Sequence, residues 1–162
     1  MEIVRGVSND SRVEIRDILE STGFFYDYEV DTALELVDET LRDGESIKGY
    51  YWLRAVKDGK TVGFTTFGLN PVSSHSWDLY WIAVHSDQRN QNLGTILLKA
   101  TEELVKEMDG KILWIETSAK PQYASTRHFY KKNDYDLEAT LRDFYGPDDS
   151  KEIYRKELLG TR

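Results

Sequence analysis

Residues 78–95 run Asp78-Leu79-Tyr80-Trp81-Ile82-Ala83-Val84-His85-Ser86-Asp87-Gln88-Arg89-Asn90-Gln91-Asn92-Leu93-Gly94-Thr95. The apolar and aromatic residues up to Val84 predict a strand over Trp77–Val84, and apolar residues at helical spacing predict a helix over Leu93–Met108. The polar residues between them form a turn that leads into the N-terminus of a helix. Such a turn presents unpaired backbone N–H groups and the positive end of the helix dipole, and it is therefore typical of a pyrophosphate site.

Two side chains within this turn favour the same interpretation. Arg89 can add a charge-assisted contact to a phosphate, and Gly94 would let the backbone approach a ligand closely. A strand–helix loop with Gly and Asn is not specific by itself, because many such loops bind nothing. Neither a Walker A motif nor GxGxxG is present, so kinase-type and dinucleotide sites have little support.

The segments around this turn predict an α/β protein. The helix over Leu93–Met108 is long enough to cross between parallel strands, and Asp109-Gly110 ends it before a strand over Lys111–Thr117. Further elements are expected as a helix from Asn9 or Asp10 to about Glu20, a helix ending near Gly44, a hairpin of Tyr50–Val56 and Thr61–Phe67 around Asp58-Gly59, a helix over Tyr123–Asn133, and a closing hairpin of Tyr135–Tyr145 and Glu152–Leu158. With a short strand at the start, the order is β α α β β β α β α β β, and residues 1–162 are expected to form a single domain.

Composition excludes several classes of function. The chain has 29 Asp and Glu against 21 Lys and Arg, a formal net charge of −8, which disfavours nucleic acid and anionic membrane surfaces as partners. There is no cysteine, the three histidines lack metal spacing, and no serine has visible histidine and acid partners, so no metal site and no serine or cysteine nucleophile are expected. Charges in Met1–Arg12 argue against a signal peptide, and no stretch is apolar enough to span a bilayer, so we expect a cytoplasmic protein.

Several blocks resemble the GNAT superfamily of N-acetyltransferases. Arg89–Gly94 resembles the family's acetyl-CoA signature, with Asn92 at its first glycine position. Asp78–Val84 resembles the fourth strand, which often contains a bulge. Tyr123–Tyr135 resembles the motif in which a helix ends in Phe-Tyr before a Gly-aromatic pair, with Asp134 in place of that glycine, and Asp143–Asp149 resembles the closing hairpin.

The resemblance implies a fold and a cosubstrate. The expected GNAT fold is a mixed six- to seven-stranded sheet flanked by about four helices and splayed between the fourth and fifth strands. Acetyl-CoA would be the cosubstrate, with its pantetheine arm along the strand and its pyrophosphate on the loop. The implied contacts are Ile82, Ala83, Val84, Arg89, Asn90, Gln91, Asn92, Leu93, Gly94 and Thr95.

Acetyl transfer to an amine needs a base, a polarised carbonyl and an acid, and the family pattern assigns each. Tyr130 would be the general acid, because a phenol stays protonated at neutral pH. Asp78 or Glu116 would be a base acting through water, and a backbone N–H near Ala83 or Val84 would polarise the carbonyl. The reaction would be direct attack by a primary amine in a ternary complex.

The acceptor entrance would lie between the connector Phe24–Tyr28 and the hairpin near Asp143 and Tyr145. Both segments are aromatic and acidic, which favours a small-molecule or peptide amine that carries positive charge. An alternative function is a non-catalytic acyl-CoA-binding module, for which Asn92 and Asp134 are the motivation, and an interaction domain without cofactor is a third. A homodimer is also open, because dimers are common among soluble homo-oligomers.

Overall fold

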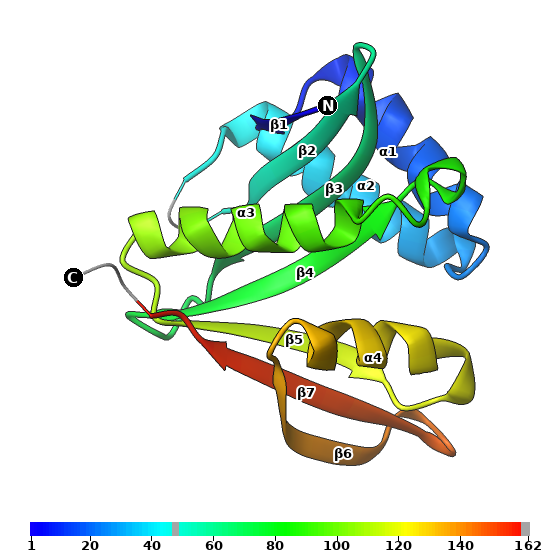
Figure 1. Ribbon diagram of the computed structural model, residues 1–162, viewed down its shortest axis with the longest axis vertical. Helices are drawn as coiled ribbons and strands as arrows, with labels where there is room; N and C mark the ends of the chain where they lie inside the picture. Colours follow the sequence, from blue (N-terminus) through cyan, green and yellow to red (C-terminus); the bar gives the residue numbers. More distant parts are fainter. Residues whose placement is uncertain (47–48, 160–162) are drawn as a thin grey trace.

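One mixed sheet runs through the structure, with helices on both of its faces (Figure 1). The computed structural model describes residues 1–46 and 49–159. The strands are β1 Glu2–Arg5, β2 Tyr51–Lys57, β3 Lys60–Leu69, β4 Ser76–Val84, β5 Ile112–Ser118, β6 Asp136–Gly146 and β7 Asp149–Glu157. The helices are α1 Asn9–Thr22, α2 Asp27–Asp43, α3 Leu93–Glu107 and α4 Ala124–Lys132.

The seven strands lie in the order β1-β2-β3-β4-β5-β7-β6. Every neighbouring pair is antiparallel except β4 and β5, which are parallel and are connected through α3. The predicted α/β class, the order of the elements and the seven-stranded mixed sheet are therefore confirmed. The single domain expected for residues 1–162 stays a prediction. No helix in the described part of the chain is long and apolar enough to cross a membrane.

Local sequence explains where most elements begin and end. At the β2–β3 turn, Asp58 and Gly59 both adopt positive φ, 52° and 76°, as a tight two-residue hairpin requires. The cap of α1 is Ser8 rather than the predicted Asn9 or Asp10. The Ser8 hydroxyl accepts the Ser11 N–H, and the Ser11 hydroxyl accepts the Ser8 N–H, so each serine satisfies a backbone donor of the other. The predicted helix over Tyr123–Asn133 is α4, Ala124–Lys132, and a 3₁₀ turn, Pro121–Tyr123, precedes it.

The sheet splits between β4 and β5, as the family pattern implied. Their parallel pairing joins Ser76–Leu79 to Ile112–Ile115 and then stops, although both strands continue. Beyond that point β4 pairs with β3 and β5 pairs with β7, so the two strands diverge (Figure 1). A bulge lies at the point of divergence: Thr66 is opposite Trp81 and Phe67 is opposite Leu79, which leaves Tyr80 as the extra residue in β4.

Two apolar clusters hold the helices to the sheet. The larger contains Phe67, Trp77 and Leu97 and lies beneath α3 and α4. The other contains Trp52 and Phe64 and lies beneath α1 and α2, which cover only the half of the sheet that ends at β4. On that side, no helix of the described residues lies over β5, β6 and β7 (Figure 1). The split and this uncovered face together define the region in which the predicted site residues lie.

Candidate active site

The loop between β4 and α3 has the geometry of an anion site. After a 3₁₀ turn, Ser86–Gln88, both Asn90 and Asn92 adopt φ 64°, and Asn92 is the residue before the first turn of α3. The backbone N–H groups from Arg89 to Thr95 meet no acceptor among the described residues. A run of unpaired donors at the positive end of a helix dipole suits a pyrophosphate. Asn92, which stands at the family's first glycine position, thus adopts a conformation that glycine favours, whereas the left-handed Asn90 had no such indication in the sequence.

Two residues of this loop, Leu93 and Gly94, lie against the interior of the protein. The side chain of Leu93 is buried in the core, so only its backbone can face a ligand. A methyl group added at Gly94 would lie 3.3 Å from the Phe129 ring. The small residue is therefore explained by the contact between α3 and α4, in addition to any approach by a ligand. Arg89, Asn90, Gln91 and Asn92 are exposed, and Thr95 is half-buried.

The last residues of β4 border the split. Ala83 is buried beside the cluster under α1 and α2, while Ile82 and Val84 pack against the cluster under α3. One edge of this segment pairs with β3, and the other edge faces the split without a strand partner. The backbone of Ile82, Ala83 and Val84 is thus the part of the strand that can pair with a bound chain, in the manner of an added strand.

Tyr130 lies on α4, which is on the β5–β7 side of the split (Figure 1). Its ring is buried and packs against the rings of Tyr135 and Tyr154, with centroids 6.2 and 6.0 Å away. Burial raises the pKa of the Tyr130 phenol above its ordinary value, which keeps it protonated. Its hydroxyl has no hydrogen-bond partner among the described residues. In that part of the chain, Thr66 Oγ1 is the one side-chain nitrogen or oxygen that is fully enclosed and lacks a hydrogen-bond partner. The Tyr130 hydroxyl must therefore reach accessible space.

The two candidate bases differ in their surroundings. Asp78 is half-buried on β4 and accepts a hydrogen bond from Asn70 Nδ2 at 3.1 Å. Burial raises the Asp78 pKa, the Asn70 hydrogen bond lowers it, and the charge of Glu116 raises it again, with a net increase. Glu116 on β5 is exposed, and its Oε2 lies 2.9 Å from Lys151 Nζ. Lys151 thus partly neutralises Glu116, while Asp78 has no cation beside it among the described residues.

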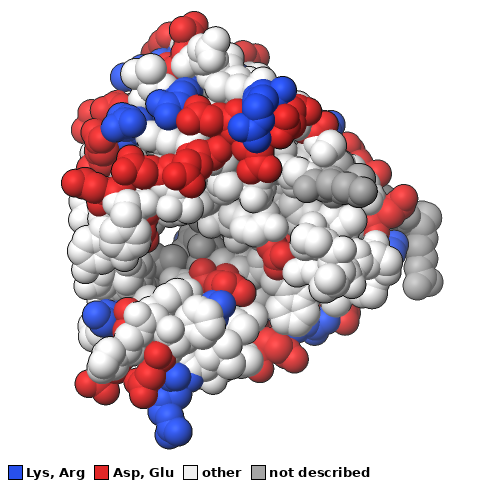
Figure 2. All heavy atoms as spheres, turned by 180° about the vertical axis from the view of Figure 1, so that it is seen from behind, with Lys and Arg blue, Asp and Glu red and all other residues white. Residues whose placement is uncertain are grey.

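Aromatic side chains from distant segments meet in two pairs in this region. Tyr50 meets Tyr80 edge to face at 5.4 Å, and Phe24 of the α1–α2 connector lies 6.1 Å from Tyr123. Burial, followed by the charge of Asp78, raises the pKa of Tyr80 to about 12. Figure 2 shows this face hollowed between the acidic surface of α1 and α2 and the β6–β7 end, with Asp and Glu visible in the hollow.

Tyr145 lies on β6 of the closing hairpin, where the charges of several other segments act on it. Burial raises the pKa of Tyr145 to about 12, and the charges of Glu116, Asp149 and Glu29 act in the same direction. Glu29 belongs to α2, so its charge acts on Tyr145 from the other side of the split. The acceptor entrance between the Phe24–Tyr28 connector and this hairpin stays a prediction.

Sequence reasoning missed several residues of this region. Asn70 and Lys151 could not be found, because each meets its carboxylate only through the folding of distant segments. Tyr80 had a usable signal, since it follows Asp78 at the spacing of one strand face. His85 accepts the Asp87 N–H on Nδ1 and begins the 3₁₀ turn, so its role is to shape the loop.

Comparison with known proteins identifies the family of this fold. The family model described as "Acetyltransferase (GNAT) family" matches residues 13–135, more than half of the chain. A solved structure of a GNAT-family protein from Desulfovibrio desulfuricans is 38% identical, covers 98% of this chain and 99% of its own, and superposes with a TM-score of 0.94. The chain belongs to the GNAT acetyltransferase family.

More distant GNAT structures share only the fold with this chain. An aminoglycoside 6'-N-acetyltransferase complexed with coenzyme A is 19% identical, with a TM-score of 0.77 and coverage of 100% of this chain and 99% of its own. The ribosomal-protein-S18-alanine N-acetyltransferase of Escherichia coli is 15% identical, with a TM-score of 0.73 and coverage of 99% and 97%. No curated protein gives a significant match. This GNAT protein is accordingly an acetyltransferase, and the fold alone does not select its acceptor.

Proposed function

We propose that this protein moves an acetyl group from acetyl-CoA to a primary amine by direct attack in a ternary complex. The observation that carries the proposal is the split between β4 and β5, which opens beside the unpaired N–H groups of Arg89–Thr95. A phosphate-bearing thioester fits such a site: its pyrophosphate meets the loop and its extended arm meets the free edge of Ile82–Val84.

Acetyl-CoA supplies an activated acetyl thioester. Asp78 receives a proton from the acceptor amine through a water molecule as the nitrogen–carbon bond forms. A backbone N–H of the free β4 edge, near Ala83 or Val84, donates a hydrogen bond to the carbonyl oxygen. Tyr130 gives its hydroxyl proton to the sulfur as the carbon–sulfur bond breaks. Solvent then carries the proton from Asp78 to the Tyr130 phenolate, which restores both groups. The products are an amide and a thiol.

Asp78 suits the role of base better than Glu116. It is half-buried and its pKa is raised, so it holds a proton more readily than an ordinary carboxylate does. Glu116 is exposed, and its carboxylate is already paired with Lys151 at 2.9 Å. Glu116 is then better placed to attract the positively charged part of an acceptor.

The acceptor is a cationic amine. The charges of Asp78 and Glu116 act on Tyr80, and those of Glu116, Asp149 and Glu29 act on Tyr145. Tyrosine rings between two groups of negative charge favour a ligand with more than one positive centre. The distant relatives named above acetylate an aminoglycoside or the alanine of a ribosomal protein, and both a polyamine and a peptide amine fit this description.

The non-catalytic acyl-CoA-binding module is the weaker candidate. Its motivation was that Asn92 and Asp134 replace family glycines. Both residues adopt the left-handed conformation a glycine would supply, with φ 64° and 69°, so the backbone keeps its path.

The test begins with calorimetric titration of acetyl-CoA, for which micromolar affinity, roughly −8 kcal/mol, is expected. Thiol release is then measured with spermidine, an aminoglycoside, a lysine-containing peptide, and neutral and anionic amines. Tyr130→Phe should lower turnover by about tenfold or more while acetyl-CoA affinity is kept. Reaction confined to neutral or anionic amines would refute the cationic acceptor, and binding without turnover of any amine would favour the non-catalytic module.

A further inference from the structure

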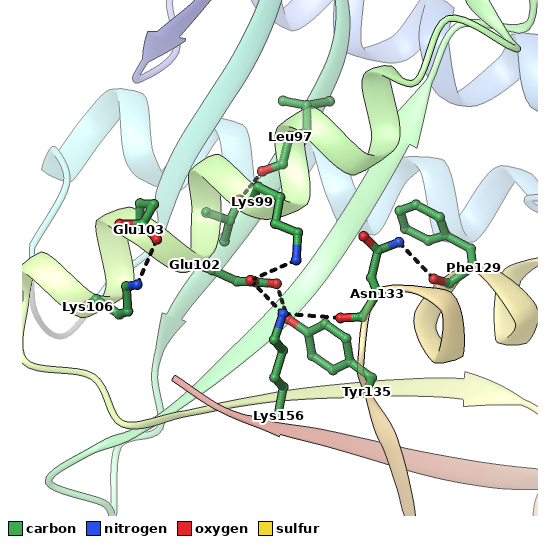
Figure 3. Close-up of polar contacts among 10 residues, drawn as sticks. Leu97, Lys99, Glu102, Glu103, Lys106, Phe129, Asn133, Tyr135 and Lys156 are labelled. Carbon is green, nitrogen blue, oxygen red and sulfur yellow. Dashed lines mark hydrogen bonds and ion pairs between the residues drawn. The ribbon is translucent and has the colours of Figure 1, made fainter. Parts of the chain in front are cut away.

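On the side of the sheet that carries α3 and α4, side chains join the two halves that the split separates. At the N-terminal end of α3, Gly94 packs against Phe129 of α4. Farther along α3, a polar network connects Glu102 to residues of β7 and of the turn after α4 (Figure 3). This network is not among the acid, base or loop groups assigned above.

Glu102 is the centre of the network. Its Oε2 accepts a hydrogen bond from the Tyr135 hydroxyl at 3.1 Å, and its Oε1 accepts one from Lys156 Nζ at 2.9 Å. Lys156 Nζ also donates to the backbone oxygen of Asn133 at 3.1 Å. In Figure 3 these side chains converge from α3, from β7 and from the turn that follows α4. Three segments distant in sequence thus share one cluster of charge-assisted hydrogen bonds.

The charged groups of the network are mostly buried, and removing charges from water costs free energy. The Glu102 side chain is 7% exposed and that of Lys156 is 17% exposed. Burying an ion pair costs several kcal/mol per ion, and apolar residues of the same volume often stabilise a fold at least as well. The particular contribution of such a network is to fix the relative positions of the groups that it connects.

The network connects directly to the turn of chain that carries Tyr130. The Tyr130 carbonyl oxygen accepts the N–H of Asn133 at 3.1 Å and the N–H of Tyr135 at 3.0 Å. Lys156 holds the carbonyl of Asn133, where a cation also meets the negative end of the α4 dipole. Tyr135 packs its ring on that of Tyr130 and anchors its own hydroxyl to Glu102. A shift of this network would therefore move Tyr130.

We propose that Glu102, Tyr135 and Lys156 are positioning residues that set the place of the Tyr130 hydroxyl relative to α3 and the donor loop. None of them is within hydrogen-bond reach of Tyr130's hydroxyl among the described residues, so they act through the backbone turn and the packed ring. The inference rests on the proposed role of Tyr130 as general acid. Positioning of this kind affects the chemical step more than the binding of acetyl-CoA.

The main test variant is Tyr135→Phe, which removes only the hydroxyl that Glu102 holds. With acetyl-CoA and the amine selected by the panel above, kcat should fall by about fivefold to tenfold while KM for acetyl-CoA stays within about twofold. Tyr154→Phe is the matched control, because Tyr154 packs on Tyr130 at nearly the same distance but gives its hydroxyl to Glu152. Its kcat should stay within about twofold of the wild type. Equal losses in both variants would overturn the proposal.

A double-variant cycle separates positioning from general stability. In the Tyr130→Phe background, Tyr135→Phe should cause no further loss of kcat beyond about twofold, since there is no hydroxyl left to position. The same loss in both backgrounds would show a structural role only and would leave Tyr130 as the acid. Wild-type turnover in Tyr130→Phe would instead remove the acid itself and this proposal with it.

Two substitutions of Lys156, one that keeps a cation and one that removes it, test whether the charge at this position is needed. Lys156→Arg keeps a donor to both Glu102 and the Asn133 carbonyl, and it should retain kcat within about threefold. Lys156→Met leaves the buried Glu102 carboxylate without its cation, so it should lower both thermal stability and kcat. If Lys156→Met folds with wild-type kcat, the network does not position Tyr130.

Discussion

Asn and Asp, in addition to glycine, supply the backbone positions with positive φ in this protein. Every non-glycine residue with positive φ in the described chain is one of these two types: Asp58, Asn90, Asn92, Asp109, Asp134, Asp143 and Asp148. Their short polar side chains tolerate this conformation better than other side chains do. Two of them, Asn92 and Asp134, stand where family members carry glycine, so these replacements preserve the local geometry and add a side chain.

Asn92 gives the first prediction at this scale. Because its φ is 64° and its side chain makes no capping hydrogen bond, Asn92→Gly should keep acetyl-CoA affinity within about twofold or tighten it. Asn92→Ala is the control, and it should weaken binding by about threefold to tenfold because alanine is strained at positive φ. Calorimetric titration measures both. A large loss of affinity in Asn92→Gly would show that the amide itself holds the ligand.

The pH dependence of turnover distinguishes the two carboxylates. If Asp78 is the base, kcat/KM rises with pH as Asp78 loses its proton, and this rise forms one limb of the pH profile. Deprotonation of the amine causes a separate rise. Asn70 stabilises the carboxylate, so Asn70→Ala should raise the Asp78 pKa further and move this limb to higher pH. Glu116→Gln removes a charge that raises the Asp78 pKa and should move the limb to lower pH. Loss of the limb in Glu116→Gln would identify Glu116 as the base.

At the scale of elements, the sequence predicted those helices, strands and turns that are determined by residues close together in the chain. The Asp58-Gly59 turn, the helix after Asn92 and the closing hairpin were predicted because turn residues and apolar spacing are local signals. Asn70 beside Asp78 and Lys151 beside Glu116 could not be predicted, since both pairs arise from long-range contact. The split between β4 and β5 came from family resemblance, because a bulge at Tyr80 has no signature in the strand's own pattern.

The turn between α3 and β5 gives a prediction about stability. A methyl group at Gly110 would lie 2.2 Å from Val105 Cγ1 and 2.7 Å from Trp77 Cδ1, with both partners in the core. Gly110→Ala should therefore destabilise the fold by about 2 kcal/mol or more, as overpacking does. The neighbouring Lys111 is exposed, and Lys111→Ala should change stability by only about 0.5 kcal/mol or less. Urea unfolding of the two variants measures the difference, and equal stabilities would contradict the contact.

For the whole molecule, charge and binding must be considered separately. The net charge of −8 repels an anionic donor at long range, yet the unpaired N–H groups of Arg89–Thr95 offer it a local site. The same net charge favours the approach of a cationic acceptor, and Asp78 and Glu116 place negative charge close together on β4 and β5. Two ligands of opposite charge can thus approach the split from different directions. This separation is what a ternary complex requires.

A ligand that lies in the split should stabilise both halves of the molecule together. At a concentration about 100 times its Kd, acetyl-CoA should add about 2.7 kcal/mol to the free energy of unfolding and, for a chain of this length, raise Tm by about 5–10 °C. CoA without the acetyl group should give nearly the same shift, because it keeps the phosphates for the loop and the arm for the β4 edge. ADP reaches only the loop, so its shift should be clearly smaller. Equal shifts with ADP and CoA would mean that the β4 edge binds nothing, and no shift at millimolar acetyl-CoA would mean that the loop does not hold a pyrophosphate.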